Sequence, residues 1–161
     1  MLRVLGVDPG TVAVGFALVE SEPTVKVIAA ELADIRSPSG PDRLEELHLE
    51  ARRVITSWKP AAVAIERLFF AKNTKTALAV AEARGALLLT FALAGITVYE
   101  YTPLEVKKQL TGDGRADKTQ IKKMLHLIAP ETRILSARDD VFDAIAIALV
   151  CCHRISARHR T

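Results

Sequence analysis

The sequence predicts an α/β fold in which a mixed five-stranded sheet is flanked by helices. Three strand-like segments separated by short turns occupy the first 35 residues, and helical and strand-like segments alternate after them. Half of the 161 residues are hydrophobic but only 5% are aromatic, so the core is sizeable and mostly aliphatic. We expect one domain over residues 1–155, followed by a basic C-terminal tail, 156–161.

The first three strands are predicted over residues 2–7, 12–19 and 25–35. Each is rich in valine, isoleucine, leucine or alanine, and Asp8-Pro9-Gly10-Thr11 provides a turn between the first two. Short turns between successive strands are typical of antiparallel pairing. This part of the chain therefore predicts an antiparallel meander.

The middle of the chain alternates helices and strands. Apolar residues at helical spacing predict a helix over 44–58, and the apolar run 61–65, which ends in Glu66, predicts a buried strand parallel to the first. A loop is predicted over 68–76 and a fifth strand over 97–101. The segment 77–94 between them is apolar on nearly every side, which predicts a buried helix and makes it our favoured homodimer face.

The last third of the sequence predicts three helices. Thr102-Pro103-Leu104-Glu105 combines a capping box with proline at the first helical position, and Asp117 to Gln120 repeats this capping pattern for a helix that ends at Ile128. A flexible loop is expected at 112–114, an irregular connection over 130–137 and a final helix over 140–153.

Composition favours a cytoplasmic protein. Cys151 and Cys152 are adjacent, which rarely suits a disulfide, so a reducing compartment is the simple interpretation. The longest apolar stretch, residues 85–96, is too short to span a bilayer, and the N-terminus lacks a signal-peptide pattern.

Cys151-Cys152-His153 has no second ligand pair, which argues against zinc. The net charge of +3 is weak support for a nucleic-acid partner.

Four acidic residues stand where strands or helices end. Asp8 follows the first strand directly, Glu66 ends the fourth, and Asp140 and Asp143 lie three residues apart near the start of the last helix. Taken singly, Asp8 also fits a turn and Asp140 an ordinary helix start, and Asp139 fits a cap or a solvated position best. Taken together, the four acids indicate a catalytic group.

Clustered carboxylates repel one another and need a cation. Mg²⁺ prefers oxygen ligands and keeps positions open for water and phosphate. Two such ions about 4 Å apart can act on the attacking water and the leaving oxygen of a phosphodiester. The acids therefore predict metal-dependent phosphodiester hydrolysis, with Mn²⁺ as a possible substitute for Mg²⁺.

Nearly the whole chain resembles the RuvC family of Holliday-junction resolvases. The resemblance rests on colinear blocks, which are Leu5 to Thr11 with Gly15, Ala64 to Glu66, Phe69, Ala71 to Asn73, Ala83 to Gly85, Glu100-Tyr101, Val106-Lys107, Lys118 to Gln120 and Asp140 to Ala148. It implies an RNase H-like fold, a homodimer and paired symmetric incisions in four-way DNA junctions during recombination and repair. It also implies Mg²⁺ or Mn²⁺ on Asp8, Glu66, Asp140 and Asp143, two ions in each site, and the RuvA–RuvB branch-migration complex as a partner.

Aromatic and basic residues around the acids predict DNA contacts. Phe69, which the resemblance favours as the stacking wedge, and Phe70 lie in the loop after Glu66, although both phenylalanines also fit a core. Lys107 and Lys118 flank the glycine loop and are expected to meet phosphate, with solvated lysines as the alternative. The remaining predicted contacts are Arg67, Lys72, Asn73 and Arg115, and weaker phosphate candidates are Lys75, Arg84 and Lys122. Arg67 departs from the family pattern, in which an uncharged residue is expected.

Three other functions remain open from the sequence. The segment Val7 to Thr11 also resembles the phosphate loop of actin-like ATPases, but that fold needs two domains, whereas this chain has room for one. A non-catalytic junction-binding protein would share the DNA-binding residues, and a RuvX-like nuclease would share the fold.

Overall fold

The computed structural model describes residues 2–21, 24–38, 40–67, 74–135 and 137–158. They form a sheet of five strands, β1 (Arg3–Asp8), β2 (Ala13–Glu20), β3 (Lys26–Asp34), β4 (Ala62–Glu66) and β5 (Thr97–Tyr101). The strand order is β3-β2-β1-β4-β5. The first three strands pair antiparallel, and β4 runs parallel to both β1 and β5. The predicted mixed sheet and its antiparallel meander are both confirmed.

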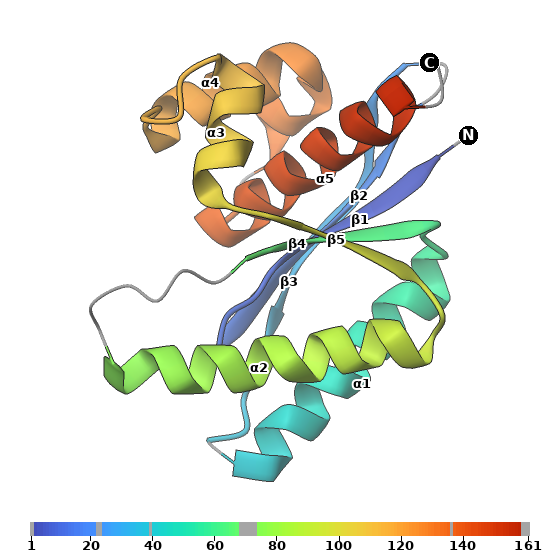
Figure 1. Cartoon of the computed structure of the whole chain (residues 1–161), viewed down its shortest axis with the longest axis vertical. Helices are drawn as coiled ribbons and strands as arrows, with labels where there is room; N and C mark the ends of the chain where they lie inside the picture. Colours follow the sequence, from blue (N-terminus) through green and yellow to red (C-terminus); the bar gives the residue numbers. More distant parts are fainter. Residues whose placement is uncertain (1, 22–23, 39, 68–73, 136, 159–161) are drawn as a thin grey trace.

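Helices cover both faces of the sheet. Helices α1 (Gly40–Trp58) and α2 (Thr74–Leu93) lie on one face, and α5 (Asp139–Arg158) crosses the other together with α3 (Pro103–Thr111) and α4 (Lys118–Ile128) (Figure 1). Two hydrophobic cores result, one on each side of the sheet. Alternation along β1 separates them, because Val4 faces the core under α5 while Leu5 and Val7 face the core under α1 and α2.

Both predicted capping boxes are present. The hydroxyl of Thr102 accepts a hydrogen bond from the amide of Glu105 at 3.2 Å, and the Glu105 carboxylate accepts from the Thr102 amide at 2.9 Å. Asp117 and Gln120 make the same reciprocal pair at the start of α4. These caps fix where α3 and α4 begin, and therefore where Lys107 and Lys118 lie relative to the sheet.

Several predicted boundaries were wrong. Helix α2 begins at Thr74, inside the segment predicted as a loop, and α5 starts one residue early and continues to Arg158, five residues past the predicted end. The alanine, isoleucine and arginine of the C-terminal segment are compatible with helix, so α5 continues into the predicted tail. The connection after α4 contains a short 3-10 helix, η1 (Pro130–Ile134), which Pro130 suits at its first position.

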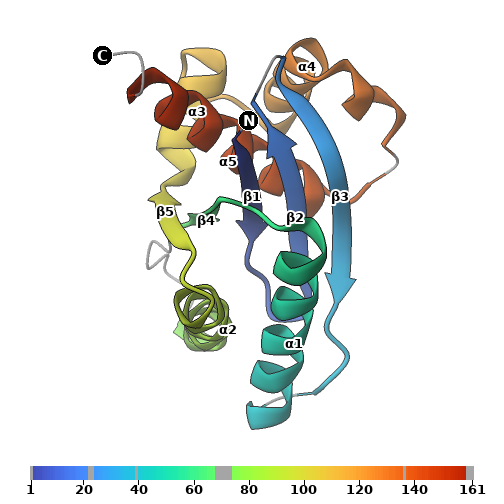
Figure 2. The same cartoon turned by 90° about the vertical axis from the view of Figure 1, so that its right-hand side faces the viewer.

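The helix predicted to be buried over 77–94 is buried on one side only in a single copy of the chain. Helix α2 packs against α1 and β5, and this contact covers one side of it (Figure 2). Leu78, Leu89 and Leu93 on the other side are 68%, 59% and 73% exposed. The sequence is apolar on a side that a single copy of the chain does not cover.

The two adjacent cysteines are not paired in a disulfide. Cys151 and Cys152 are free buried thiols, and Cys152 donates a weak hydrogen bond to the carbonyl of Val19 at 3.8 Å. Across the described ranges, no helix has the length and apolar character needed to span a bilayer.

Candidate active site

Asp8 and Glu66 occupy matching positions on neighbouring strands. Val7 pairs with Ile65 in the parallel ladder, so the next residue on each strand is one of the two acids. Gly6 and Ala64, two residues earlier, face α5, and the period of two along a strand places both carboxylates on that same face. Both side chains are half-buried. The parallel pairing therefore brings two acids that lie 58 positions apart in the chain to one edge of the sheet.

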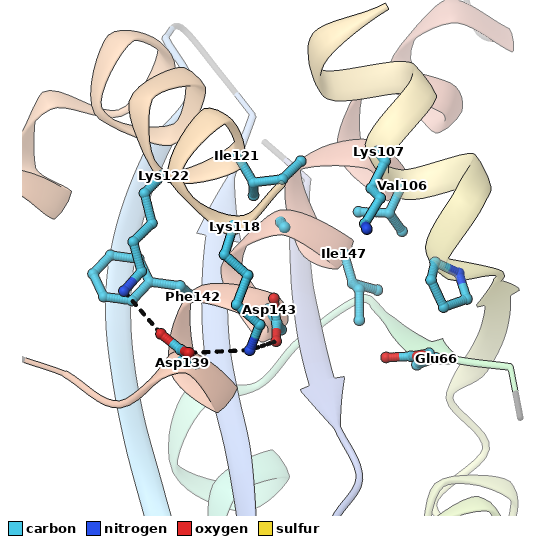
Figure 3. A pocket seen from close by; sticks show the side chains of 12 residues that line it. Glu66, Val106, Lys107, Lys118, Ile121, Lys122, Asp139, Phe142, Asp143 and Ile147 are labelled. Carbon is cyan, nitrogen blue, oxygen red and sulfur yellow. Dashed lines mark hydrogen bonds and ion pairs between the residues drawn. The ribbon is translucent and has the colours of Figure 1, made fainter. Parts of the chain in front are cut away.

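The first turns of α5 carry the other two acids. Asp140 and Asp143 lie three residues apart, which places both on neighbouring parts of the helix surface. Arg138 forms a salt bridge of 3.4 Å with the Asp140 carboxylate and a longer one, 3.8 Å, with Asp34 at the end of β3. Asp143 faces the space between α5 and β4, opposite Glu66 (Figure 3).

Two glycines let the start of α5, which carries Asp140 and Asp143, approach the strands closely. A Cβ atom on Gly6 would lie 1.9 Å from the carbonyl oxygen of Ala144, and one on Gly15 would lie 2.1 Å from that of Asp140. Gly15 pairs directly with Asp8 across the β1–β2 ladder. Because glycine has no side chain, these two positions allow the close spacing between Asp8 and the first turn of α5.

The acids perturb one another electrostatically. Burial, followed by repulsion from Glu66, Asp143 and Asp140, raises the pKa of Asp8 from an ordinary value of 3.8 to about 8, against the opposing effect of Lys118. Burial and the charge on Asp143 raise the pKa of Glu66, and burial raises the pKa of Asp143. Such shifts arise where like charges are held together, and they are typical of functional sites.

A cleft of about 210 Å³ opens between β4, α3, α4 and α5 beside these acids. Glu66 and Asp143 lie at its edge, and Lys107 and Lys118 approach from α3 and α4 (Figure 3). The Lys118 ammonium is 3.9 Å from a carboxylate oxygen of Asp143, and the charge of Lys107 opposes, without cancelling, the rise in the pKa of Glu66. The structure thus places both predicted lysines next to the acids.

Asp139 lies outside the four acids but is not simply solvated. One of its oxygens accepts a hydrogen bond from Lys118 at 3.0 Å and the other accepts from Lys122 at 2.8 Å. These two ammonium groups lower the pKa of Asp139 to about 2, the opposite direction from Asp8. The sequence alone gave no reason to expect this pairing, because α4 and α5 meet only in the folded chain.

Arg84, a predicted phosphate contact, has its partners within the protein. Its guanidinium, 14% exposed, donates a hydrogen bond of 3.0 Å to the main-chain carbonyl of Glu66 and pairs with Glu100 on β5. Arg84 therefore fixes the end of β4 from α2, a positioning role that its sequence context did not reveal. Arg67 is exposed and lies 3.9 Å from the same Glu100 carboxylate.

Of the remaining predicted DNA contacts, Arg115 lies within the described residues. Arg115 is exposed in the loop before α4, where its amide is held by Asp113. Phe69, Phe70, Lys72 and Asn73 lie outside the described residues.

The donor set suits a hard divalent cation. All four candidate ligands are carboxylates, the ligand type that Mg²⁺ and Mn²⁺ prefer, and a cation would offset the repulsion that raises the pKa of Asp8. Among the described residues, no three side chains of His, Cys, Asp or Glu are close enough together to form a complete metal site. Glu66 faces Asp143 across the cleft, and the Lys118 ammonium lies beside Asp143 (Figure 3).

The sheet order and the position of the acids define a class. A meander of three antiparallel strands, extended by two parallel strands and carrying carboxylates on β1, β4 and the last helix, is the RNase H-like arrangement of metal-dependent nucleases. The family model "Crossover junction endodeoxyribonuclease RuvC" matches residues 4–153. The chain belongs to the RuvC family.

Known relatives match over nearly their full length. The chain is 42% identical over 159 residues to crossover junction endodeoxyribonuclease RuvC of Caldicellulosiruptor saccharolyticus, covering 97% of this chain and 94% of that one. It is 45% identical over 157 residues to the protein of that name from Roseiflexus sp., covering 96% and 92%. Thermus thermophilus RuvC in complex with a Holliday junction substrate superposes with a TM-score of 0.84 at 32% identity, covering 100% of this chain and 98% of that one. Membership of this family decides against the actin-like and RuvX-like alternatives.

Proposed function

We propose that this chain is a structure-selective endonuclease that resolves four-way DNA junctions by paired symmetric incisions. One observation carries the proposal. Asp8 and Glu66 end adjacent parallel strands in register, on the face where Asp140 and Asp143 begin α5, and two lysines approach the same cleft. The RuvC relatives, one of them in complex with a Holliday junction substrate, support junction DNA as the substrate.

In this proposal Asp8, Glu66, Asp140 and Asp143 hold Mg²⁺, two ions in each site as the resemblance implies. Bound there, the ions would neutralise the carboxylates and polarise water and the phosphodiester for hydrolysis. Gly6 and Gly15 keep the two pairs of acids at a fixed spacing, and Arg84 holds the end of β4 that carries Glu66.

Lys107 and Lys118 are proposed to contact the phosphate that is cut. Both extend toward the cleft that Glu66 and Asp143 border, and an ammonium there stabilises the charge that develops on phosphorus oxygens. Arg67 and Arg115 are exposed and would contact flanking phosphates. The resemblance adds Phe69, Phe70, Lys72 and Asn73, with Phe69 as the residue that stacks on an unpaired base.

The test is incubation of the purified chain and Mg²⁺ with a synthetic four-way junction, beside a linear duplex of the same sequence. We expect two nicks at symmetric positions in the junction and none in the duplex. Tight binding of the junction without incision in Mg²⁺ or Mn²⁺ would instead identify a non-catalytic junction-binding protein.

Symmetric incision requires two active sites, and helix α2 supplies a surface for a homodimer. Leu78, Leu89 and Leu93 are 11 and 4 residues apart, so they form one stripe along the exposed side of α2. Contiguous exposed apolar side chains are typical of surfaces that pack against a partner. We propose that the stripe packs against a second copy, and the resemblance adds the RuvA–RuvB complex as a further partner.

Replacing Leu89 and Leu93 together with glutamate is expected to dissociate the dimer, because each copy would bury two like charges in the interface. Sedimentation should show the mass falling from twice 17.5 kDa to 17.5 kDa, and junctions should lose paired cuts. The control is Leu127→Glu, which places one glutamate on a leucine of α4 that is 67% exposed, between the exposures of Leu89 and Leu93. A double variant that remains dimeric contradicts the proposed interface.

A further inference from the structure

Asp139 links two lysines of α4 to the first turn of α5. Its Oδ2 atom accepts from Lys118 at 3.0 Å and its Oδ1 atom accepts from Lys122 at 2.8 Å, so both oxygens are used (Figure 3). Asp140, the next residue, belongs to the four acids of the candidate site. Two consecutive aspartates at the start of one helix therefore have different surroundings: Asp139 pairs with the lysines of α4, whereas Asp140 pairs with Arg138.

Lys122 is held from two directions. Besides its hydrogen bond to Asp139, its ammonium lies 4.6 Å from the centre of the Phe142 ring, at a distance typical of cation–π contact. The ring itself is buried against the core under α5. An anchored Lys122 fixes the rotation of the Asp139 carboxylate and leaves the other oxygen directed at Lys118.

Lys118, by contrast, depends on Asp139 for its position. It is the first residue of α4 and its side chain is 66% exposed, so its long alkyl chain has little packing to restrain it. Within the described part of the chain its one hydrogen-bond partner is Asp139. That bond holds the ammonium beside Asp143, at 3.9 Å, rather than free in solvent.

We propose that Asp139 is a positioning residue that holds the Lys118 ammonium at the mouth of the active site, ready to meet the phosphate. The contacts run in series from the Phe142 ring through Lys122 and Asp139 to Lys118. This inference rests on the proposed function, because it assigns Asp139 a part in phosphodiester cleavage. Asp139 itself touches neither substrate nor metal in it.

A purely electrostatic effect of Asp139 predicts the opposite sign. Removing an acid near bound DNA reduces repulsion, so it should strengthen junction binding and leave kcat equal or higher. Loss of positioning should lower kcat at saturating junction while KM changes little, because Lys118 would still carry its charge but spend less time at the phosphate. Ion pairs this exposed contribute little to stability, so the melting temperature should not change.

The experiment compares kcat and KM for wild type, Asp139→Asn and Asp139→Glu on a synthetic junction with Mg²⁺. We expect kcat to fall about tenfold in Asp139→Asn, with substantial recovery in Asp139→Glu. In a Lys118→Ala background, Asp139→Asn should change kcat by less than about twofold, because the residue it positions is gone. Lys122→Gln should lower kcat, while Lys123→Gln, the same charge change at the next residue of α4, should not.

A second readout does not depend on cleavage. In ¹H–¹⁵N spectra of the lysine ammonium groups, Lys118 should be ordered and protected from solvent exchange in the wild type, and Asp139→Asn should abolish this. An unchanged kcat in Asp139→Asn, or a disordered Lys118 ammonium in the wild type, overturns the inference. If the wild type does not cut junctions at all, the proposed function fails and the spectra alone decide whether Asp139 positions Lys118.

Discussion

Replacing Glu66 with glutamine lowers junction cleavage about a thousandfold or more while leaving junction binding intact. Glutamine has the shape of glutamate but carries no charge and presents one oxygen in place of two. Glu66 ends β4 beside Asp8 and faces Asp143 across the cleft, so the substitution removes a ligand from the centre of the donor set.

Fold and DNA affinity should survive this change. Glu66 is half-buried, and its pKa is raised because burial disfavours its charge, so a neutral side chain there costs the fold nothing and relieves repulsion from Asp143. Its main-chain carbonyl, which accepts from Arg84, is unaffected. The loss is therefore confined to the chemical step.

The measurement is single-turnover cleavage of a labelled junction, with gel-shift affinity in Ca²⁺ as the parallel assay. The matched control is Glu31→Gln on edge strand β3, which makes the same change at a strand glutamate that pairs with Arg53 away from the cleft. A Glu66→Gln variant that cuts at the wild-type rate would remove the four acids from the mechanism. Equal losses in both variants would point to a general effect of charge.

Sequence reasoning located the acids because their signals are local. An acid at the end of an apolar strand is visible from a few residues, as at Glu66, and two acids three apart on a helix are visible from spacing, as at Asp140 and Asp143. That Asp8 and Glu66 lie side by side depends on which strands pair. The sequence is compatible with Asp8 and Glu66 being neighbours, and the parallel register of β1 with β4 makes them neighbours.

The supporting contacts were not readable for the same reason. The sequence predicts a weak phosphate contact at Arg84 because nothing nearby in the chain shows that α2 brings it against the carbonyl of Glu66. Asp139 looked like a helix cap because its partners are on α4, about twenty residues earlier in the sequence. Helix α2 looked like a core helix because an apolar sequence does not distinguish burial within one chain from burial between two.

Replacing Asp8 with asparagine is expected to stabilise the metal-free protein at pH 8. The folded chain holds the Asp8 proton with a pKa of about 8, whereas the unfolded chain holds it with the ordinary value of 3.8. Below about pH 4 Asp8 is protonated in both states and does not change the free energy of unfolding. As pH rises from about 4 to about 8 the unfolded chain releases this proton first, so the free energy of unfolding falls, and above about pH 8 it falls no further on account of Asp8. Asparagine has no proton to release.

The stabilisation should be about 2 kcal/mol, less than the full shift implies because Asp8 is partly open to solvent, and should raise Tm by about 4–8 °C. Thermal unfolding in EDTA between pH 5 and 8 measures it. The wild type should lose stability with rising pH, and Asp8→Asn should flatten this slope without abolishing it, since the pKa values of Glu66 and Asp143 are raised too. Glu45→Gln, an exposed acid of α1, provides the control.

Mg²⁺ should reverse the order of the two proteins at pH 8. A cation bound by ionised carboxylates stabilises the wild type, and it does so more as pH rises, because ionisation then no longer opposes folding. Asp8→Asn, which lacks one ligand, should gain less from the same Mg²⁺ concentration. If Asp8→Asn melts below the wild type in EDTA at pH 8, Asp8 is not held under repulsion in the folded chain. If Mg²⁺ leaves both melting temperatures unchanged, the carboxylates do not form its site.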